Sequence, residues 1–386
     1  MPPVLPPPIV IADEAGLDRL VQELARHPII AVDTESNSLH AYRERVCLIQ
    51  FSTPLDDFIL DPIRVNDLQP LAAVFANPAQ QKVFHAAEYD IICLRRDYQF
   101  QFKNLFDTMS AARSLGWPQV GLSAILEARF GVTMNKKYQR ADWGRRPLRP
   151  EQLDYARLDT HYLLQLRDLQ LQALIAAGHW PEAEEEFERI ASLGADAEPS
   201  ATGDDAFWRV KGARDLAPVQ SAILQELFAY RDEQARRIDR PLFMVMGDAT
   251  LMELARRAPR RSEDLPGIPG MTADQIRRHG PAVLRAIERG LRAPAPRPPQ
   301  AVREPDDVRD RYDRLHTWRK ERARARGVES DVILPRRALL DLARRPPRTE
   351  EDLTHITDFG PWRRRTYGEA ILALVSSDPK KAGREP

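Results

Sequence analysis

The sequence predicts an α/β domain with a mixed sheet, followed by two small all-α domains. Residues 9 to about 110 alternate short apolar runs with segments that have the apolar spacing of helices, which is typical of α/β domains. The C-terminal half contains an ungapped internal repeat without strand-like runs. Two linker-like stretches, 192–205 and 291–305, separate these parts. With 386 residues, the chain is long enough for two or three domains.

Four apolar runs in the first part are predicted to be strands, namely 28–33, 45–53, 57–61 and 82–86. The first three lie close together in the sequence, so we expect them to be neighbours in the sheet. Residues 150–176 have the spacing of one long amphipathic helix. Pro150 can start this helix because proline is favoured at the first helical position.

The repeat in the C-terminal half predicts two copies of one small helical domain. Residues 230–265 align without gaps on residues 318–353, at a constant offset of 88 positions. We therefore place the three domains at 1–195, 206–292 and 306–380. Both copies are expected to bind or position structured RNA, and the alternative is that they are architectural spacers. One copy can also bind while the other packs, since repeats often diverge in this way.

Charge and cysteine content restrict the class of protein. Residues 1–200 carry 20 Lys and Arg against 28 Asp and Glu, whereas residues 201–386 carry 37 against 29. An acidic part joined to a basic part suggests a cation site attached to a module that meets a polyanion, although a basic face can also be merely solvated. Two cysteines in apolar runs, Cys47 and Cys93, fit a reducing cytoplasm. We expect no signal peptide and no membrane span, and a monomer.

The stretch AVDTESNSL places two carboxylates directly after a buried strand. Residues i and i+2 of a strand face the same side, so Asp33 and Glu35 point toward one place. Packed carboxylates raise each other's pKa unless a cation neutralises them. Taken alone, the pair also fits a surface turn, so a cation site would need further acids from other parts of the chain.

Two further segments supply acidic side chains. Asp90 opens the apolar helical stretch IICL, where a helix cap is the simpler interpretation. Tyr155 and Asp159 are four apart on the predicted long helix and share one face, as ordinary polar pairs also do. Converging carboxylates suit hard cations with oxygen ligands, and the lack of Cys and His clusters argues against zinc. Two divalent ions would stabilise the attacking and leaving oxygens of a phosphodiester, and a tyrosine nearby would orient or deprotonate the attacking water.

The order D-x-E, H-x4-D and Y-x3-D resembles the DEDD 3′–5′ exonucleases of the tyrosine subclass, which have a ribonuclease-H-like fold. The segment KYQRADWGRRPLRPEQLDYARLDTHYL resembles the ribonuclease D branch, and the two repeats resemble the HRDC domain shared by RecQ helicases and ribonuclease D. The resemblance implies two divalent metal ions, Mg²⁺ or Mn²⁺, with Mg²⁺ favoured by availability. It implies metal ligation by Asp33, Glu35, Asp90 and Asp159, and positioning of the nucleophile by Tyr155.

A basic loop before the catalytic helix is the predicted RNA contact. It supplies Lys136, Lys137, Arg140, Trp143, Arg145 and Arg146, although Trp143 can equally be a packing residue. His85 either touches the terminal nucleotide or satisfies a strand end. The turn after Glu35 is the expected place for reading the RNA 2′-hydroxyl.

The resemblance implies a metal-dependent 3′–5′ exoribonuclease that releases nucleoside 5′-monophosphates from structured RNA such as tRNA precursors. A DNA-preferring exonuclease and a non-catalytic nucleic-acid-binding scaffold are the alternatives. Asp107 is also an acid before a helix. Because Thr108 and a helical run follow it, we interpret Asp107 as a cap and assign the second-motif role to Asp90.

Overall fold

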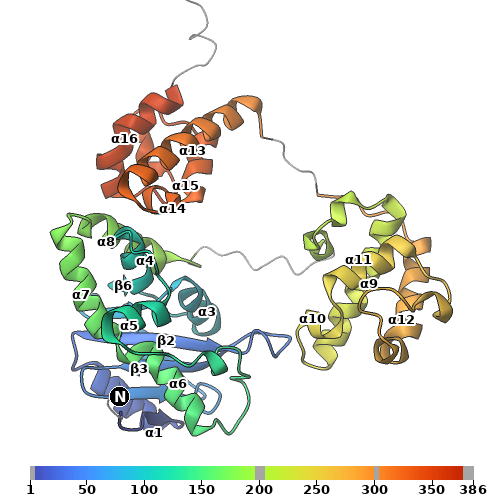
Figure 1. Ribbon diagram of the computed structural model, residues 1–386, viewed down its shortest axis with the longest axis horizontal. Helices are drawn as coiled ribbons and strands as arrows, with labels where there is room; N and C mark the ends of the chain where they lie inside the picture. The colour runs from blue at the N-terminus through green and yellow to red at the C-terminus, as the bar shows by residue number, and fades with distance from the viewer. Residues whose placement is uncertain (1–4, 196–204, 300–303, 377–386) are drawn as a thin grey trace, which may run out of the picture. The chain divides into compact units, whose positions relative to one another are not determined.

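The computed structural model describes residues 5–195, 205–299 and 304–376, which form an α/β domain and two helical bundles (Figure 1). Six strands form one mixed sheet in the order β1-β4-β3-β2-β5-β6. Their bounds are β1 Ile9–Ile11, β2 Ile29–Ser36, β3 Val46–Ser52, β4 Asp57–Leu60, β5 Gln81–Phe84 and β6 Leu105–Asp107. The predicted α/β domain followed by helical domains is confirmed.

The four predicted strands are present as β2 to β5, and the first three are neighbours in the sheet as expected. β3 and β4 pair antiparallel, whereas β2 and β5 pair parallel, which makes the sheet mixed. β1 and β6 were not predicted. Each has three residues, which is too short for an alternating pattern to stand out from the sequence around it.

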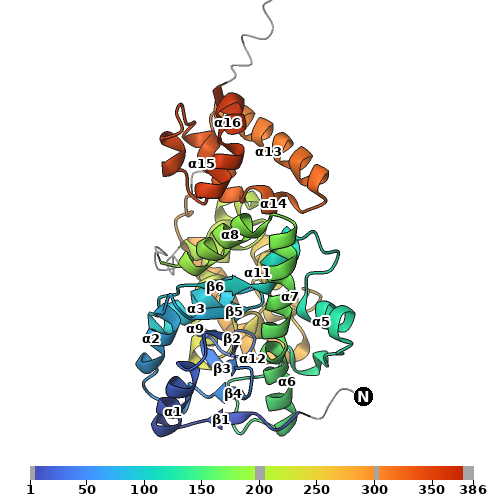
Figure 2. The ribbon, with the colours of Figure 1, turned by 90° about the vertical axis from the view of Figure 1, so that its left-hand side faces the viewer.

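Helices cover both faces of the sheet, with α1 and α2 on one side and α6 and α7 on the other (Figure 2). The helices of this domain are α1 Glu14–Leu24, α2 Ala72–Ala76, α3 Glu88–Tyr98, α4 Thr108–Ser114, α5 Leu122–Phe130, α6 Pro150–His161, α7 Leu163–Ala176 and α8 Trp180–Ser192. Pro150 begins α6 as predicted.

The prediction of a single helix over 150–176 is wrong, because the helix is interrupted at Tyr162. The two side chains at the break have partners on different elements. His161 lies 2.9 Å from the Asp57 carboxylate, and the Tyr162 ring stacks on Phe130. Helical periodicity continues across such a break, so the sequence pattern does not reveal it.

The helical repeat is confirmed by the positions of its helices. The first bundle comprises α9 Pro218–Arg237, α10 Leu242–Val245, α11 Asp248–Arg257 and α12 Ala273–Arg292, and the second comprises α13 Asp306–Arg326, α14 Ser330–Ile333, α15 Arg336–Arg344 and α16 Pro361–Ser376. The last three helices of the two bundles start 88 residues apart, as the sequence offset requires.

Interactions inside the two bundles repeat as well. Arg231 of α9 donates to the Met246 carbonyl at 3.1 Å, and Arg319 of α13 donates to the Leu334 carbonyl at 2.9 Å. Both arginines are buried, so each satisfies a carbonyl that water cannot reach. The two bundles are therefore copies of one fold down to single hydrogen bonds.

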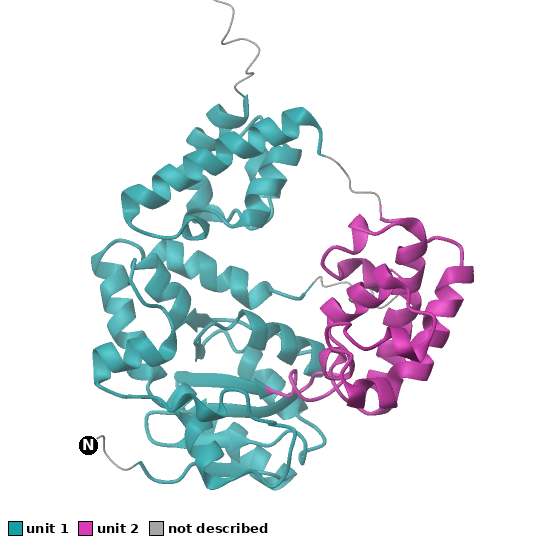
Figure 3. Ribbon diagram, turned by 45° about the vertical axis from the view of Figure 1, so that its right-hand side comes forward, with its two compact units in different colours: residues 1–35, 46–196, 303–386 teal, residues 36–45, 197–302 magenta. Residues whose placement is uncertain are grey.

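The chain divides into two compact units (Figure 3). The first contains residues 1–35, 46–196 and 303–386, so the second helical bundle packs with the α/β domain. The other contains residues 36–45 and 197–302, so the loop between β2 and β3 packs with the first bundle. There the Tyr42 hydroxyl donates to Asp232 at 2.7 Å. The predicted linkers fall partly at 196–204 and 300–303, which lie outside the described residues.

Among the described helices, we find none that combines the length and the apolar character needed to cross a membrane.

Candidate active site

β2 carries the first two acidic side chains of the site. The strand is fully buried at Ile30, Ala31 and Val32 and continues through Asp33, Thr34 and Glu35. Alternation along the strand directs both carboxylates to one side of the sheet. The sequence therefore ends a hydrophobic strand with two acids that face the same place.

Asp90 is the third residue of α3 and is 7% exposed. Its carboxylate does not cap the helix, whose cap position is Ala87. Instead, Asp90 accepts a hydrogen bond from the Thr34 hydroxyl. Because Thr34 lies between the two acids of β2, this bond fixes α3 next to the first motif.

α6 supplies Tyr155 and Asp159 and packs against β3 and β4. Burial, followed by the charge of Asp90, raises the pKa of Asp159 to about 7. Burial also raises the pKa of Tyr155, and the charges of Asp159, Glu35 and Asp33 act in the same direction. The tyrosine hydroxyl is therefore close to three carboxylates and keeps its proton at neutral pH.

The pKa values of the four carboxyl groups show that they face one region. Burial, then Asp159 and Asp90, raises the pKa of Glu35 to about 9. The pKa of Asp33 is raised well above its usual range by burial and then by Asp90, Asp159 and Glu35. Burial raises the pKa of Asp90 to about 7 despite the hydrogen bond from Thr34.

Divalent cations fit this group of side chains. Carboxylate oxygens are the ligands that Mg²⁺ and Mn²⁺ prefer, and the charge of two such ions would offset the repulsion between the acids. Within the described part of the chain, no three carboxylate, imidazole or thiol groups already stand in a chelating arrangement. Ion binding would thus draw these acids closer together.

Asp107 has a structural role, as predicted. It is fully buried and caps α4, where one carboxylate oxygen accepts from the Ser110 N–H at 2.6 Å. Its other oxygen accepts from the Ala87 N–H at 2.6 Å. Asp107 therefore joins the start of α4 to the residue that precedes α3.

The basic loop before α6 divides into exposed and buried side chains. Lys136, Lys137, Arg140 and Arg145 are exposed at its surface. They present positive charge next to the helix that carries Tyr155, which agrees with their predicted contact with RNA.

Two members of the predicted RNA-contact set are engaged inside the protein, which for Trp143 is the packing alternative that the sequence left open. Trp143 is 1% exposed and stacks on the Tyr155 ring, with centroids 6.1 Å apart, so its face is not open to a base. Arg146 donates twice to the Asp61 carboxylate, at 2.6 and 2.8 Å, and also to the Cys47 carbonyl. Both side chains hold the loop onto the sheet, a role that only the tertiary contacts reveal.

His85 lies at the end of β5 and contacts Thr108, with 2.8 Å between Nδ1 and the hydroxyl oxygen. Burial lowers the pKa of His85 to about 4. The imidazole is therefore neutral at pH 7 and brings no positive charge to a phosphate.

Sequence reasoning did not single out Thr34 or the Trp143–Tyr155 pair. Thr34 stands between the two acids but points to the opposite side of a regular strand, so nothing in the pattern marks it as a partner of Asp90. The tryptophan was noted for its place in a basic loop. Its stacking on Tyr155 depends on how that loop folds back onto α6.

Comparisons with known proteins identify both kinds of domain in this chain. A family model described as 3′–5′ exonuclease matches residues 8–174, and the HRDC domain model matches residues 220–287 and 308–375. Ribonuclease D of Pseudomonas paraeruginosa is 30% identical over 95% of this chain and 97% of its own length. Ribonuclease D of Acidiphilium cryptum is 29% identical over 96% of this chain and 94% of its own length.

A solved structure shares the fold across nearly the whole chain. Escherichia coli RNase D, described as an exoribonuclease involved in structured RNA processing, superposes with a TM-score of 0.68 at 24% identity. The match covers 95% of this chain and 98% of that one.

Proposed function

Because this chain belongs to the ribonuclease D family and is a 3′–5′ exoribonuclease, we propose that Asp33, Glu35, Asp90, Tyr155 and Asp159 form its active site. The observation that supports this assignment is the meeting of one buried carboxyl group, Asp90, with three half-buried ones, and after burial the charges of neighbouring acids raise the pKa of Asp33, Glu35 and Asp159 further. Neighbouring carboxyl groups whose pKa values are raised destabilise a fold, so their presence argues for a function.

Enzymes of this fold use divalent metal ions, and here the four carboxylates are the proposed ligands. Asp33 would contact both ions, Glu35 and Asp159 the ion nearer the attacking water, and Asp90 would act through a coordinated water. When bound, the ions would stabilise charge on the attacking and leaving oxygens of the phosphodiester. Mg²⁺ is the proposed ion because of its availability, and Mn²⁺ fits the same ligands.

Tyr155 orients the attacking water in this proposal. Its raised pKa keeps the hydroxyl protonated at neutral pH, so it acts by hydrogen bonding and does not remove the proton of the water. The ring is held on one face by Trp143 and at its edge by Tyr138, with centroids 6.1 and 6.2 Å away. This packing fixes the direction of the hydroxyl.

The substrate is proposed to be the single-stranded 3′ end of a structured RNA, such as a tRNA precursor. The exposed cations of the loop before α6, namely Lys136, Lys137, Arg140 and Arg145, would follow the phosphates. Trp143 and Arg146 would hold the loop that carries these cations against the sheet and α6. The proposal includes a cytoplasmic monomer with domains at 1–195, 206–292 and 306–380.

Matched RNA and DNA oligonucleotides, each labelled at the 5′ end, test the proposal. We expect a ladder that shortens from the 3′ end of RNA with Mg²⁺ and is absent with EDTA. Asp33→Asn should remove turnover but leave RNA binding intact. A stronger ladder on DNA would instead support the DNA-preferring alternative, and full activity of Asp33→Asn would contradict the assigned site.

A further inference from the structure

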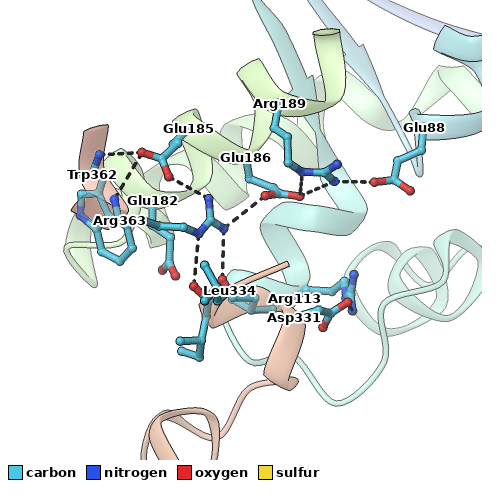
Figure 4. A network of polar contacts seen from close by, with 12 residues as sticks. Glu88, Arg113, Glu182, Glu185, Glu186, Arg189, Asp331, Leu334, Trp362 and Arg363 are labelled. Atoms are coloured by element: carbon cyan, nitrogen blue, oxygen red, sulfur yellow. Dashed lines mark hydrogen bonds and ion pairs between the residues drawn. The ribbon is translucent and has the colours of Figure 1, made fainter. Parts of the chain in front are cut away.

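The second helical domain, α13 to α16, is joined to the α/β domain by a buried arginine (Figure 4). Arg363 is 1% exposed and donates to Glu185 at 2.9 Å and to Glu186 at 3.2 Å, both on α8. Glu185 also accepts from the backbone N–H of Trp362 at 2.6 Å. Two buried or half-buried acids of α8 are thus bound by one end of α16.

α8 is in turn bonded to α3 at two places. Arg189 donates to Glu186 at 2.7 Å and to Glu88 at 2.5 Å, and Glu88 is the first residue of α3 (Figure 4). The buried Arg95 of α3 donates to the last carbonyls of α8, including those of Ala191 and Ser192 at 3.0 Å each. The Glu88 contact lies at the surface and is weak alone, but Arg95 makes α3 and α8 one rigid pair.

A second set of contacts, through α4, also connects the second helical domain with α3. Arg113 of α4 pairs with Glu329 at 2.5 Å and with Asp331 at 2.6 Å. At the other end of α4, Asp107 holds the N–H of Ala87, just before α3. α8 and α4 are therefore each bonded to the beginning of α3, through Glu88 and Ala87, and the first turn of α3 carries Asp90.

This docking is specific to the second copy of the repeat. The residue of the first copy equivalent to Arg363 is Gln275, whose side chain donates to the Val245 carbonyl at 3.3 Å. Arg363 makes the equivalent bond to the Ile333 carbonyl at 3.2 Å and then reaches beyond its own domain to α8. At the position of Asp331, which pairs with Arg113 of α4, the first copy has the exposed Phe243 and therefore no carboxylate for such a pair. The fold that the two copies share thus requires only the bond to the carbonyl within the same domain. The longer side chain of Arg363 adds the contact with α8.

We propose that Arg363 is a positioning residue for the nuclease reaction, because it holds α8, and through it the first turn of α3, in the place where Asp90 meets Asp33, Glu35 and Asp159. This inference rests on the proposed role of Asp90. It gives the second helical domain a part in assembling the active site that does not depend on RNA touching that domain.

The test is Arg363→Gln, which introduces the residue of the first copy. The substrate is a single-stranded oligoribonucleotide too short to extend to the helical domains. We expect kcat to fall about tenfold, KM for RNA to stay unchanged, and the Mg²⁺ concentration for half-maximal rate to rise. Arg363→Lys, which keeps the charge but cannot reach both acids with a planar fork, should give an intermediate rate.

Arg326→Gln is the matched control. Arg326 pairs with Glu182 near the start of α8 at 2.7 Å and donates to the Ser114 carbonyl of α4 at 3.4 Å, so it lies in the same interface without bonding to Glu186 or Glu185. It should leave kcat and the Mg²⁺ dependence near those of the parent protein. An equal loss in Arg326→Gln, or unchanged kcat and Mg²⁺ dependence in Arg363→Gln, would overturn the proposal.

Two further variants distinguish a failure of this proposal from a failure to fold and from a failure of the proposed function. If Arg363→Gln does not fold, Glu186→Gln replaces it, because Arg363 then keeps its bond to Glu185. A smaller fall in kcat is expected, since only the charge that links Arg363 to Arg189 is lost, and an unchanged rate would overturn the proposal. Asp90→Asn should lower turnover at least about a hundredfold. An active Asp90→Asn would refute the role of Asp90 itself, whereas an inactive one with a fully active Arg363→Gln would refute only the positioning role.

Discussion

Asp90 and Asp107 are both buried acids at the beginning of helices, and substitution by asparagine should affect them in opposite ways. Asp107 accepts two backbone N–H bonds of 2.6 Å in a fully buried position. The asparagine amide can accept only one of them, which leaves the other donor without a partner. An orphaned buried donor costs about 1–3 kcal/mol, or a fall in Tm of about 2–10 °C for a domain of this size.

Asp90→Asn should leave Tm unchanged or raise it when measured with EDTA at pH 8. Burial raises the pKa of Asp90 to about 7, so the charged carboxylate is unfavourable in the folded protein at this pH. Asparagine removes the charge and still accepts from the Thr34 hydroxyl. Activity should fall at least about a hundredfold, because metal ligation is worth several kcal/mol to the transition state.

The assays are thermal unfolding by circular dichroism and RNA turnover per folded molecule. Asp107→Asn should keep turnover within about tenfold of that of the parent protein at a temperature well below its lower Tm, and Mg²⁺ should still raise that Tm. For Asp90→Asn, the stabilisation by Mg²⁺ should be smaller. The reasoning is refuted if Asp107→Asn loses turnover without losing stability, or if Asp90→Asn lowers Tm as much as Asp107→Asn does.

Three other changes have expected outcomes. Tyr155→Phe should lower kcat about a hundredfold in single-turnover assays with Tm unchanged, because the ring keeps its aromatic contacts and only the hydroxyl is lost. Without divalent ions, the free energy of unfolding in urea should fall as pH rises from about 4 to 9: the folded protein holds protons on Glu35 and Asp159 that the unfolded chain has released. Replacing Lys136 and Lys137 together by Ala should raise KM for RNA and reduce its salt dependence, with little change in kcat.

Each of these outcomes has a control. Tyr138→Phe keeps the neighbouring ring and should have nearly full turnover, so an equal loss there would contradict the role of Tyr155. Glu35→Gln should flatten the pH dependence of stability, and an unchanged slope would show that this group does not titrate as stated. For the lysine pair, a loss confined to kcat would contradict phosphate contact.

The sequence predicted the parts of the site that follow from local geometry. The two acids of β2 share a side because strands have a period of two, and Tyr155 and Asp159 share a face because helices bring residues four apart together. The helical repeat was visible because its copies align without gaps. These features need no knowledge of the tertiary structure.

Features that depend on tertiary contacts were not predicted. The burial of Trp143 follows from the folding of its loop onto α6, and the break at Tyr162 from partners on other elements. The docking of the second helical domain depends on Arg363, which looks like one more charge in the basic run RRR. Only its contacts with Glu185 and Glu186 show it to be a buried link between domains.

The most direct test of the account is to locate Mn²⁺ in crystals by its anomalous scattering. The account predicts two peaks between the side chains of β2, α3 and α6, with oxygens of Asp33, Glu35 and Asp159 among the ligands and Asp90 close by. In Asp159→Asn, at least one peak should weaken. Peaks confined to other parts of the molecule, with the four carboxylates unligated, would contradict the account.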